Sequence, residues 1–153
     1  METTEQLREL FRYNEWANRR MIDTLWGEDC PRAIAILAHL ITTENEYFDR
    51  LSGKDSTGFN FWPEITFDKI EEAADRSARQ YRDLLTGCTE EVLNKLARYK
   101  TSAGAEHENT YRELLTHVVM HSAIHRGNIM LKLRESGIEP PQIDYIIYLR
   151  QGN

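Results

Sequence analysis

Three histidines near the C-terminal end of the chain have a spacing that suits metal chemistry. His117, His121 and His125 follow one another at intervals of four residues. Residues four apart lie on one face of an α-helix, so the three imidazoles are expected to form a row. Two imidazoles at this spacing can bind one metal ion, as in the His-Glu-x-x-His helices of zinc enzymes. Here Ser122 stands where those enzymes have the glutamate base, so the pair alone is a moderately specific signal.

A fourth histidine, His39, lies in the apolar segment Leu-Ala-His-Leu-Ile, where a solvated role is not expected. A single buried histidine is more often a hydrogen-bonded core residue than a metal ligand. Burying three imidazoles without partners for their nitrogens is costly, and one shared metal ion removes that cost. A pair on one helix with a third histidine on another buried helix therefore favours metal binding. Helix bundles build such sites from facing helices.

Four helical patterns must position these histidines. Apolar residues recur at steps of three and four in segments of roughly 20 residues, over 3–27, 31–51, 68–87 and 110–137. Capping boxes are expected at Thr3 with Gln6, at Asp68 with Glu71, and at Thr110 with Glu113. These patterns predict an all-α fold, a four-helix bundle that forms a single domain over residues 1–153.

The segments between the helices are expected to be irregular. Residues 52–63 form a loop whose aromatic end, from Phe59 to Pro63, is expected to cover the core rather than to rim a pocket. Residues 97–109 predict a short extended excursion before the last long helix, without a full sheet. A short helix is expected over residues 144–150.

Charge and hydropathy exclude several classes of partner. The 153 residues include 19 basic and 25 acidic side chains, a net charge of -6, and no basic block stands out. Nucleic acid and anionic membrane are therefore not expected as partners. No run approaches the roughly 18 apolar residues of a membrane span, and the N-terminus lacks the layout of a secretory signal. Cys30 and Cys88 form no metal or redox motif. We expect a cytoplasmic protein.

Three stretches of the sequence resemble one known family. They are Tyr13–Asn18 in the first helix, Leu37–Leu40 in the second, and the block from Leu114 to Arg150, which contains His-Ser-Ala-Ile-His-Arg-Gly-Asn, a Pro-Pro break and an Asp-Tyr segment. The chain resembles the DinB/YfiT-like superfamily of metal-binding four-helix bundles, which includes thiol-dependent S-transferases. Asn128 stands where that family usually has Gln.

The resemblance implies that His39, His121 and His125 are the metal ligands. It leaves out His117, for which a hydrogen bond between helices or a supporting role behind the ligands is expected, while His107 is expected in an exposed loop. Three neutral imidazoles suit zinc or nickel first, with iron or copper as alternatives. Three protein ligands also leave a position open for water or substrate.

Two charged residues near these histidines are weak catalytic candidates. Glu44 lies in the core stripe of the second helix and could support a ligand or act as a general base, but burial beside Arg126 or Asn14 explains it equally well. Arg126 could hold a substrate carboxylate, although a structural ion pair is the preferred interpretation.

Several functions are consistent with these features. The preferred one is a metal-dependent enzyme acting on a small molecule, either an S-transferase that uses a low-molecular-weight thiol or a hydrolase. The alternative is a non-catalytic metal-binding protein of a stress response. A third hypothesis is a helical dimer without metal. A homodimer is also predicted. Tyr13, Trp16 and Ile22 give the first helix a second apolar face, the second helix is apolar beyond its bundle-facing stripe, and members of the family commonly pair.

Overall fold

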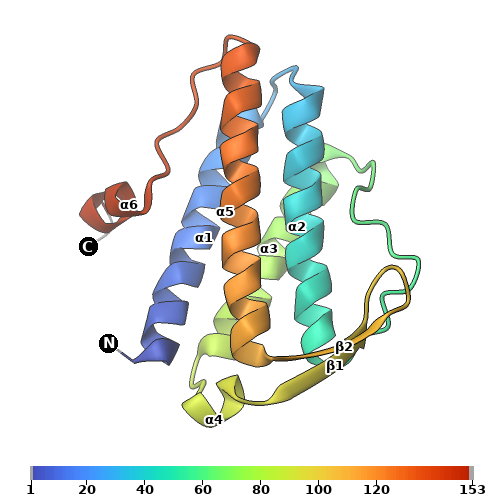
Figure 1. The fold of residues 1–153 in the computed structure, drawn as a ribbon. Helices are drawn as coiled ribbons and strands as arrows, with labels where there is room; N and C mark the ends of the chain where they lie inside the picture. The colour runs from blue at the N-terminus through green and yellow to red at the C-terminus, as the bar shows by residue number, and fades with distance from the viewer. Residues whose placement is uncertain (1, 152–153) are drawn as a thin grey trace.

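Four long helices form the body of the protein. The computed structural model describes residues 2–151, and its bundle consists of α1 (Thr3–Leu25), α2 (Pro31–Leu51), α3 (Phe67–Leu85) and α5 (Tyr111–Glu135). Figure 1 shows α5 beside both α1 and α2, with α3 behind them. The predicted all-α four-helix bundle is therefore confirmed. No helix of residues 2–151 is both long and apolar enough to span a membrane.

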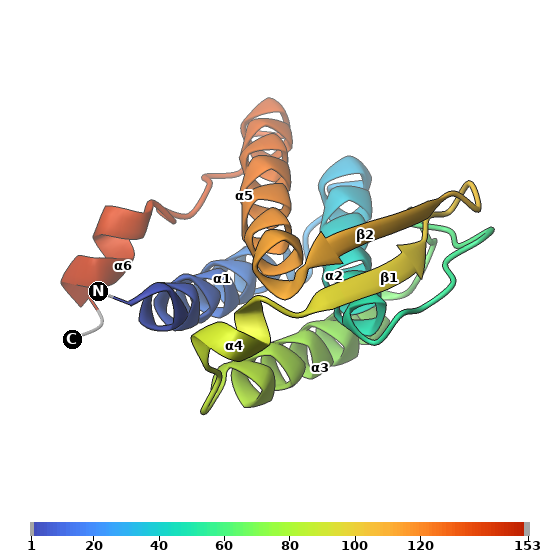
Figure 2. The same cartoon turned by 60° about the horizontal axis from the view of Figure 1, so that its bottom comes forward.

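Short elements close the lower end of the bundle. After α4 (Glu90–Leu93), strands β1 (Leu96–Lys100) and β2 (Glu106–Thr110) pair antiparallel, with Ala97 opposite Asn109. This hairpin lies across the end where α2 finishes and α5 begins (Figure 2). The extended excursion is thus a two-stranded sheet. The sequence did not predict the second strand, because Glu-His-Glu-Asn-Thr in β2 lacks the alternation of apolar and polar residues that is typical of a strand.

The helix caps explain where the long helices begin. Thr110 caps α5 as predicted, since its Oγ1 accepts from the Glu113 amide at 3.1 Å and the Glu113 carboxylate accepts from the Thr110 amide at 3.0 Å. The other two predicted boxes are wrong by one or two residues. Glu2 precedes α1 and its amide donates to Glu5, while Thr66 caps α3.

The C-terminal segment packs back onto the outer face of α1. The Tyr13 hydroxyl donates to the carbonyl of Ile143 at 2.6 Å, and the Trp16 ring lies 5.4 Å from that of Tyr148 in α6 (Tyr145–Gln151). Ile22 is only 1% exposed and belongs to the core. The face of α1 that suggested a homodimer is therefore largely covered by the chain itself, and that argument for the dimer does not hold.

Candidate metal centre

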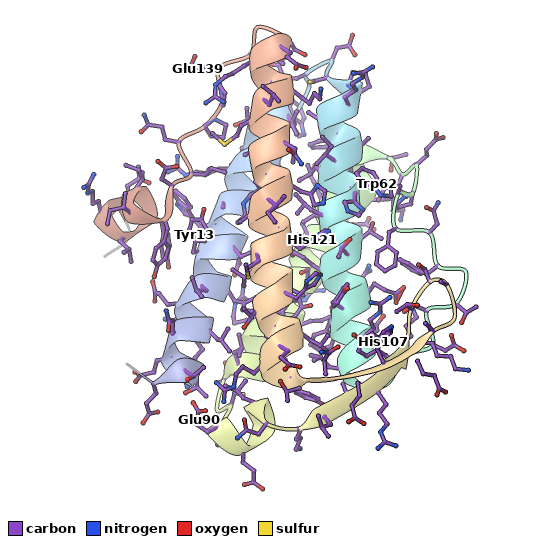
Figure 3. The ribbon with its side chains drawn as sticks, in the orientation of Figure 1. Tyr13, Trp62, Glu90, His107, His121 and Glu139 are labelled. Carbon is purple, nitrogen blue, oxygen red and sulfur yellow. The ribbon has the colours of Figure 1, made fainter. Side chains whose placement is uncertain are left out.

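The fold brings three of the four candidate histidines together. His39 comes from α2, and His121 and His125 come from consecutive turns of α5. One nitrogen from each ring lies within 4.8 Å of the others. The His39 ring centroid is 5.0 Å from that of His121 and 4.6 Å from that of His125. Figure 3 shows His121 on the side of α5 that faces α2, with Trp62 on the loop beyond α2.

The loop before α3 fixes the orientation of His39. Its Nδ1 lies 2.6 Å from the carbonyl oxygen of Phe61, which can only accept, so Nδ1 carries the proton and the lone pair is on Nε2. The Trp62 ring stacks on the imidazole with centroids 3.7 Å apart and planes 2° apart. Trp62 is 52% exposed. The aromatic end of this loop thus rims the site, and the prediction that it covers the core is wrong for Trp62.

Burial keeps the imidazoles of the cluster neutral at neutral pH. Desolvation lowers the pKa of His39 and of His125 below its ordinary value of 6.5. The pKa of His121 falls to about 4, first because of desolvation and then because of the charges that His125, His39 and His117 would carry. A neutral imidazole keeps a lone pair, which is the form that binds metal.

Two buried ring nitrogens of the cluster have no hydrogen-bond partner among the described residues. Nδ1 of His121 and Nδ1 of His125 are enclosed, and no described residue bonds to either atom. Buried polar atoms of this kind are rare in proteins and usually have a water, ion or ligand as partner. The donor set is entirely imidazole, which suits a divalent transition metal and not calcium or magnesium. The residues present therefore fit a metal ion.

Comparison with known proteins identifies the family of the chain. The DinB family matches residues 1–152 of the chain. The chain belongs to the DinB family. Protein DinB of Bacillus subtilis (strain 168) is 28% identical over 159 residues, which cover 92% of this chain and 91% of that protein. The predicted resemblance to the DinB/YfiT-like superfamily is confirmed.

The other two histidines of this DinB-family protein lie outside the cluster. His117 is one turn before His121, with ring centroids 5.7 Å apart, and it packs against the Tyr47 ring of α2 at 4.7 Å. His117 thus contacts the neighbouring helix through its ring, where a hydrogen bond between helices was one of the two expected roles. His107 is exposed, as expected, but lies in strand β2 and not in a loop.

Glu44 lies at the centre of a buried hydrogen-bond network. Its Oε2 accepts from Asn14 and Asn18 of α1, both at 2.9 Å, and from Ser122 of α5 at 2.6 Å, while its Oε1 accepts from Ser77 of α3 at 2.7 Å. Glu44 is 2% exposed. These donors satisfy the carboxylate from three helices, and none of them is a histidine.

Arg126 joins the same network without touching Glu44. Its Nη1 donates to the side-chain oxygens of Asn14 at 2.6 Å and Asn18 at 2.8 Å, so the two amides stand between the buried cation and the buried anion. Arg126 is 0% exposed. Sequence reasoning proposed Asn14 as a partner but missed Asn18, Ser77 and Ser122, whose periodic positions in buried stripes were the available signal.

Proposed function

We propose that this DinB-family protein binds one divalent transition-metal ion through His39, His121 and His125. The observation that carries the proposal is the approach of three imidazole nitrogens, from two helices, to within 4.8 Å. The enclosed, unpartnered Nδ1 atoms of His121 and His125 support it, as does the lowered pKa of all three rings. Zinc or nickel suits this donor set best, with iron or copper as alternatives.

We further propose that the site is catalytic and that the protein is a thiol-dependent S-transferase acting on a small molecule. A metal ion held by these three residues would lower the pKa of a thiol or water bound to it. In the transfer, the thiol loses its proton to water, its sulfur forms a bond to an electrophilic carbon, and the leaving group departs with the electron pair of the bond that it held to that carbon. His39, held by Phe61 and shielded by Trp62, gives the cluster one fixed ring orientation.

The resemblance to the DinB/YfiT-like superfamily, which includes thiol-dependent S-transferases, favours thiol transfer over hydrolysis. None of the hydrogen bonds of the Glu44 carboxylate involves a histidine, so its contacts do not identify it as the base of a hydrolase. A non-catalytic metal-binding protein of a stress response stays the alternative.

The metal site is tested with untagged protein. After incubation with zinc or nickel and gel filtration, elemental analysis should find one metal ion per chain. His39→Ala, His121→Ala and His125→Ala should each lose most of it, and His117→Ala, the matched control, should lose much less. Wild-type protein without metal, or equal loss in His117→Ala, would refute the ligand assignment.

The catalytic proposal needs a separate assay. Metal-loaded protein should accelerate the loss of thiol in mixtures of low-molecular-weight thiols and a panel of electrophiles, and the three ligand variants should not. Full metal occupancy without any consumption of thiol or hydrolysis of esters and amides would favour the non-catalytic alternative.

We propose that the protein is cytoplasmic, because two free cysteines such as Cys30 and Cys88 stay reduced in that compartment.

A further inference from the structure

A buried arginine lies on the bundle near the proposed metal centre. Arg50, in the last turn of α2, is 3% exposed. Its guanidinium carbon lies over three aromatic rings, at 4.6 Å from the centre of Tyr47, 5.0 Å from Tyr99 and 5.4 Å from Phe61. Three electron-rich ring faces stabilise a cation and hold it in one position.

No carboxylate balances this charge. The Arg50 Nε donates to the Ser56 hydroxyl at 3.1 Å, and none of the ion pairs among the described residues includes Arg50. The nearest acidic residues in sequence, Glu46 and Asp49, pair with Lys54 instead. A buried guanidinium without a counterion is costly, and a charged partner of opposite sign recovers that cost.

Two sets of contacts connect Arg50 to the histidine cluster. Phe61 supplies one, because its ring faces Arg50 and its carbonyl accepts from His39. Tyr47 supplies the other, because its ring contacts both Arg50 and His117, and His117 contacts His121. Arg50 therefore lies along the same side of α2 as the cluster, and its charge helps to lower the pKa of His117.

We propose that Arg50 binds a carboxylate of the small molecule whose other end reaches the three-histidine cluster. This rests on the proposed function of the cluster as a metal-dependent site. The planar guanidinium, with its Nη groups not committed to a described partner, matches a carboxylate in two parallel hydrogen bonds. The substrate class is thus an anionic thiol and not a neutral or cationic one.

The fold also sets the size of that molecule. His39 and Arg50 are eleven residues apart on α2, which separates their Cα atoms by about 16 Å along the helix axis. Both side chains lean back towards the start of the helix, so the longer arginine shortens this span only slightly. A thiol that contacts both ends must therefore have a chain of several bonds between its sulfur and its carboxylate.

The test compares thiols that differ only in their far end. Cobalt(II)-loaded protein is titrated with 8-mercaptooctanoate, 8-mercapto-1-octanol and 3-mercaptopropanoate, and binding is read from the sulfur-to-cobalt absorption band. 8-Mercaptooctanoate should bind at least about tenfold more tightly than 8-mercapto-1-octanol and than 3-mercaptopropanoate, as a hydrogen-bonded ion pair predicts. Arg50→Gln should abolish the difference in affinity between 8-mercaptooctanoate and 8-mercapto-1-octanol. Arg98→Gln, which removes an exposed arginine of β1, should keep it.

Other outcomes separate this inference from the proposed function. Equal binding of 8-mercaptooctanoate and 8-mercapto-1-octanol by metal-loaded wild type would overturn the role of Arg50 without affecting the assignment of the metal site, and this comparison needs no variant. If Arg50→Gln does not fold, Arg50→Lys should keep part of the preference for 8-mercaptooctanoate. If the protein takes up no metal, calorimetry of 8-mercaptooctanoate binding to metal-free wild type, to Arg50→Lys and to the control Arg98→Gln still tests the anion site. Weaker binding by Arg50→Lys alone supports the inference, and no binding by wild type, or equal binding by all three, overturns it.

Discussion

At the scale of single residues, the site depends on atoms that a sequence pattern does not contain. The clustering of His39, His121 and His125 could be predicted in part, because the four-residue spacing of His121 and His125 is visible in the chain and the family resemblance implied His39 as their partner. The group that orients His39 could not, because it is the backbone carbonyl of Phe61, and every residue has one. The same holds for Arg50, whose unpaired charge is evident only after Tyr47, Phe61 and Tyr99 are seen around it.

The lowered pKa of His121 predicts how stability depends on pH. The folded group titrates at about 4 and the unfolded group at 6.5, so between these values only the unfolded chain binds the proton. Its contribution, about 2 kcal/mol after allowance for partial exposure, is complete above pH 6.5 and is lost as pH falls towards 4. His39 and His125 act in the same direction.

Thermal unfolding of metal-free protein should therefore show a melting temperature that falls from about pH 7 to about pH 4.5. His121→Gln should flatten this slope, and His107→Gln, which changes an exposed histidine, should leave it unchanged. A melting temperature that stays constant over this range would contradict the buried, neutral state of the cluster.

Trp62 should contribute to metal affinity without touching the metal. It stacks on His39 at 3.7 Å and covers the outer side of that ring. Trp62→Ala frees the ring and admits water, so the dissociation constant for zinc should rise by about tenfold, as for other groups that support metal ligands. Competition with a chelator measures this value. Trp26→Ala, at the exposed end of α1, is the control and should bind zinc like wild type.

At the scale of elements, the rotation of α5 is set by polar residues on the face next to the histidines. Ser122 and Arg126 follow His121 and His125 directly in sequence and bind the network of Glu44, Asn14 and Asn18. One residue corresponds to about 100° around a helix, so fixing one pair fixes the direction of the other. The buried stripe could be predicted, but the partners of Ser122 and Arg126 could not, since they come from two other helices, α1 and α2.

Glu44 is therefore expected to stabilise the bundle. Glu44→Gln turns one acceptor oxygen into a donor that faces a donor of Ser77, Ser122, Asn14 or Asn18. The free energy of unfolding should fall by about 2–4 kcal/mol, which urea titration measures. Glu64→Gln, on the exposed loop, should change it by less than about 0.5 kcal/mol. A stable Glu44→Gln variant that loses only activity would instead identify Glu44 as a general base.

At the scale of the whole molecule, the sequence does not predict which segments far apart in the chain pack against each other. The long helices could be predicted from apolar periodicity, and the two ends of α5 from the Thr110 cap and from Gly137. The packing of α6 on Tyr13 and Trp16 has no local signal, because any apolar surface elsewhere in the chain could have covered those rings. That one contact changed which surface is available to a second copy.

The proposed homodimer must therefore use another face. Met120, Ile124 and Leu131 lie along the outside of α5 and are 60%, 64% and 51% exposed. Because apolar side chains gathered on one helix face are typical of interfaces, we expect α5 to pack against its copy in a second chain. Light scattering at micromolar concentration should give about twice the 18.0 kDa of one chain.

Ile124→Glu decides whether this face forms the dimer, because a carboxylate at its centre would be buried without a partner. The variant should elute as a monomer with an unchanged helical spectrum. Ile146→Glu, an equally simple change at a 51% exposed position of α6, should stay dimeric. If Ile146→Glu dissociates and Ile124→Glu does not, the interface is on the α6 side. Wild type at the mass of one chain would remove the dimer altogether.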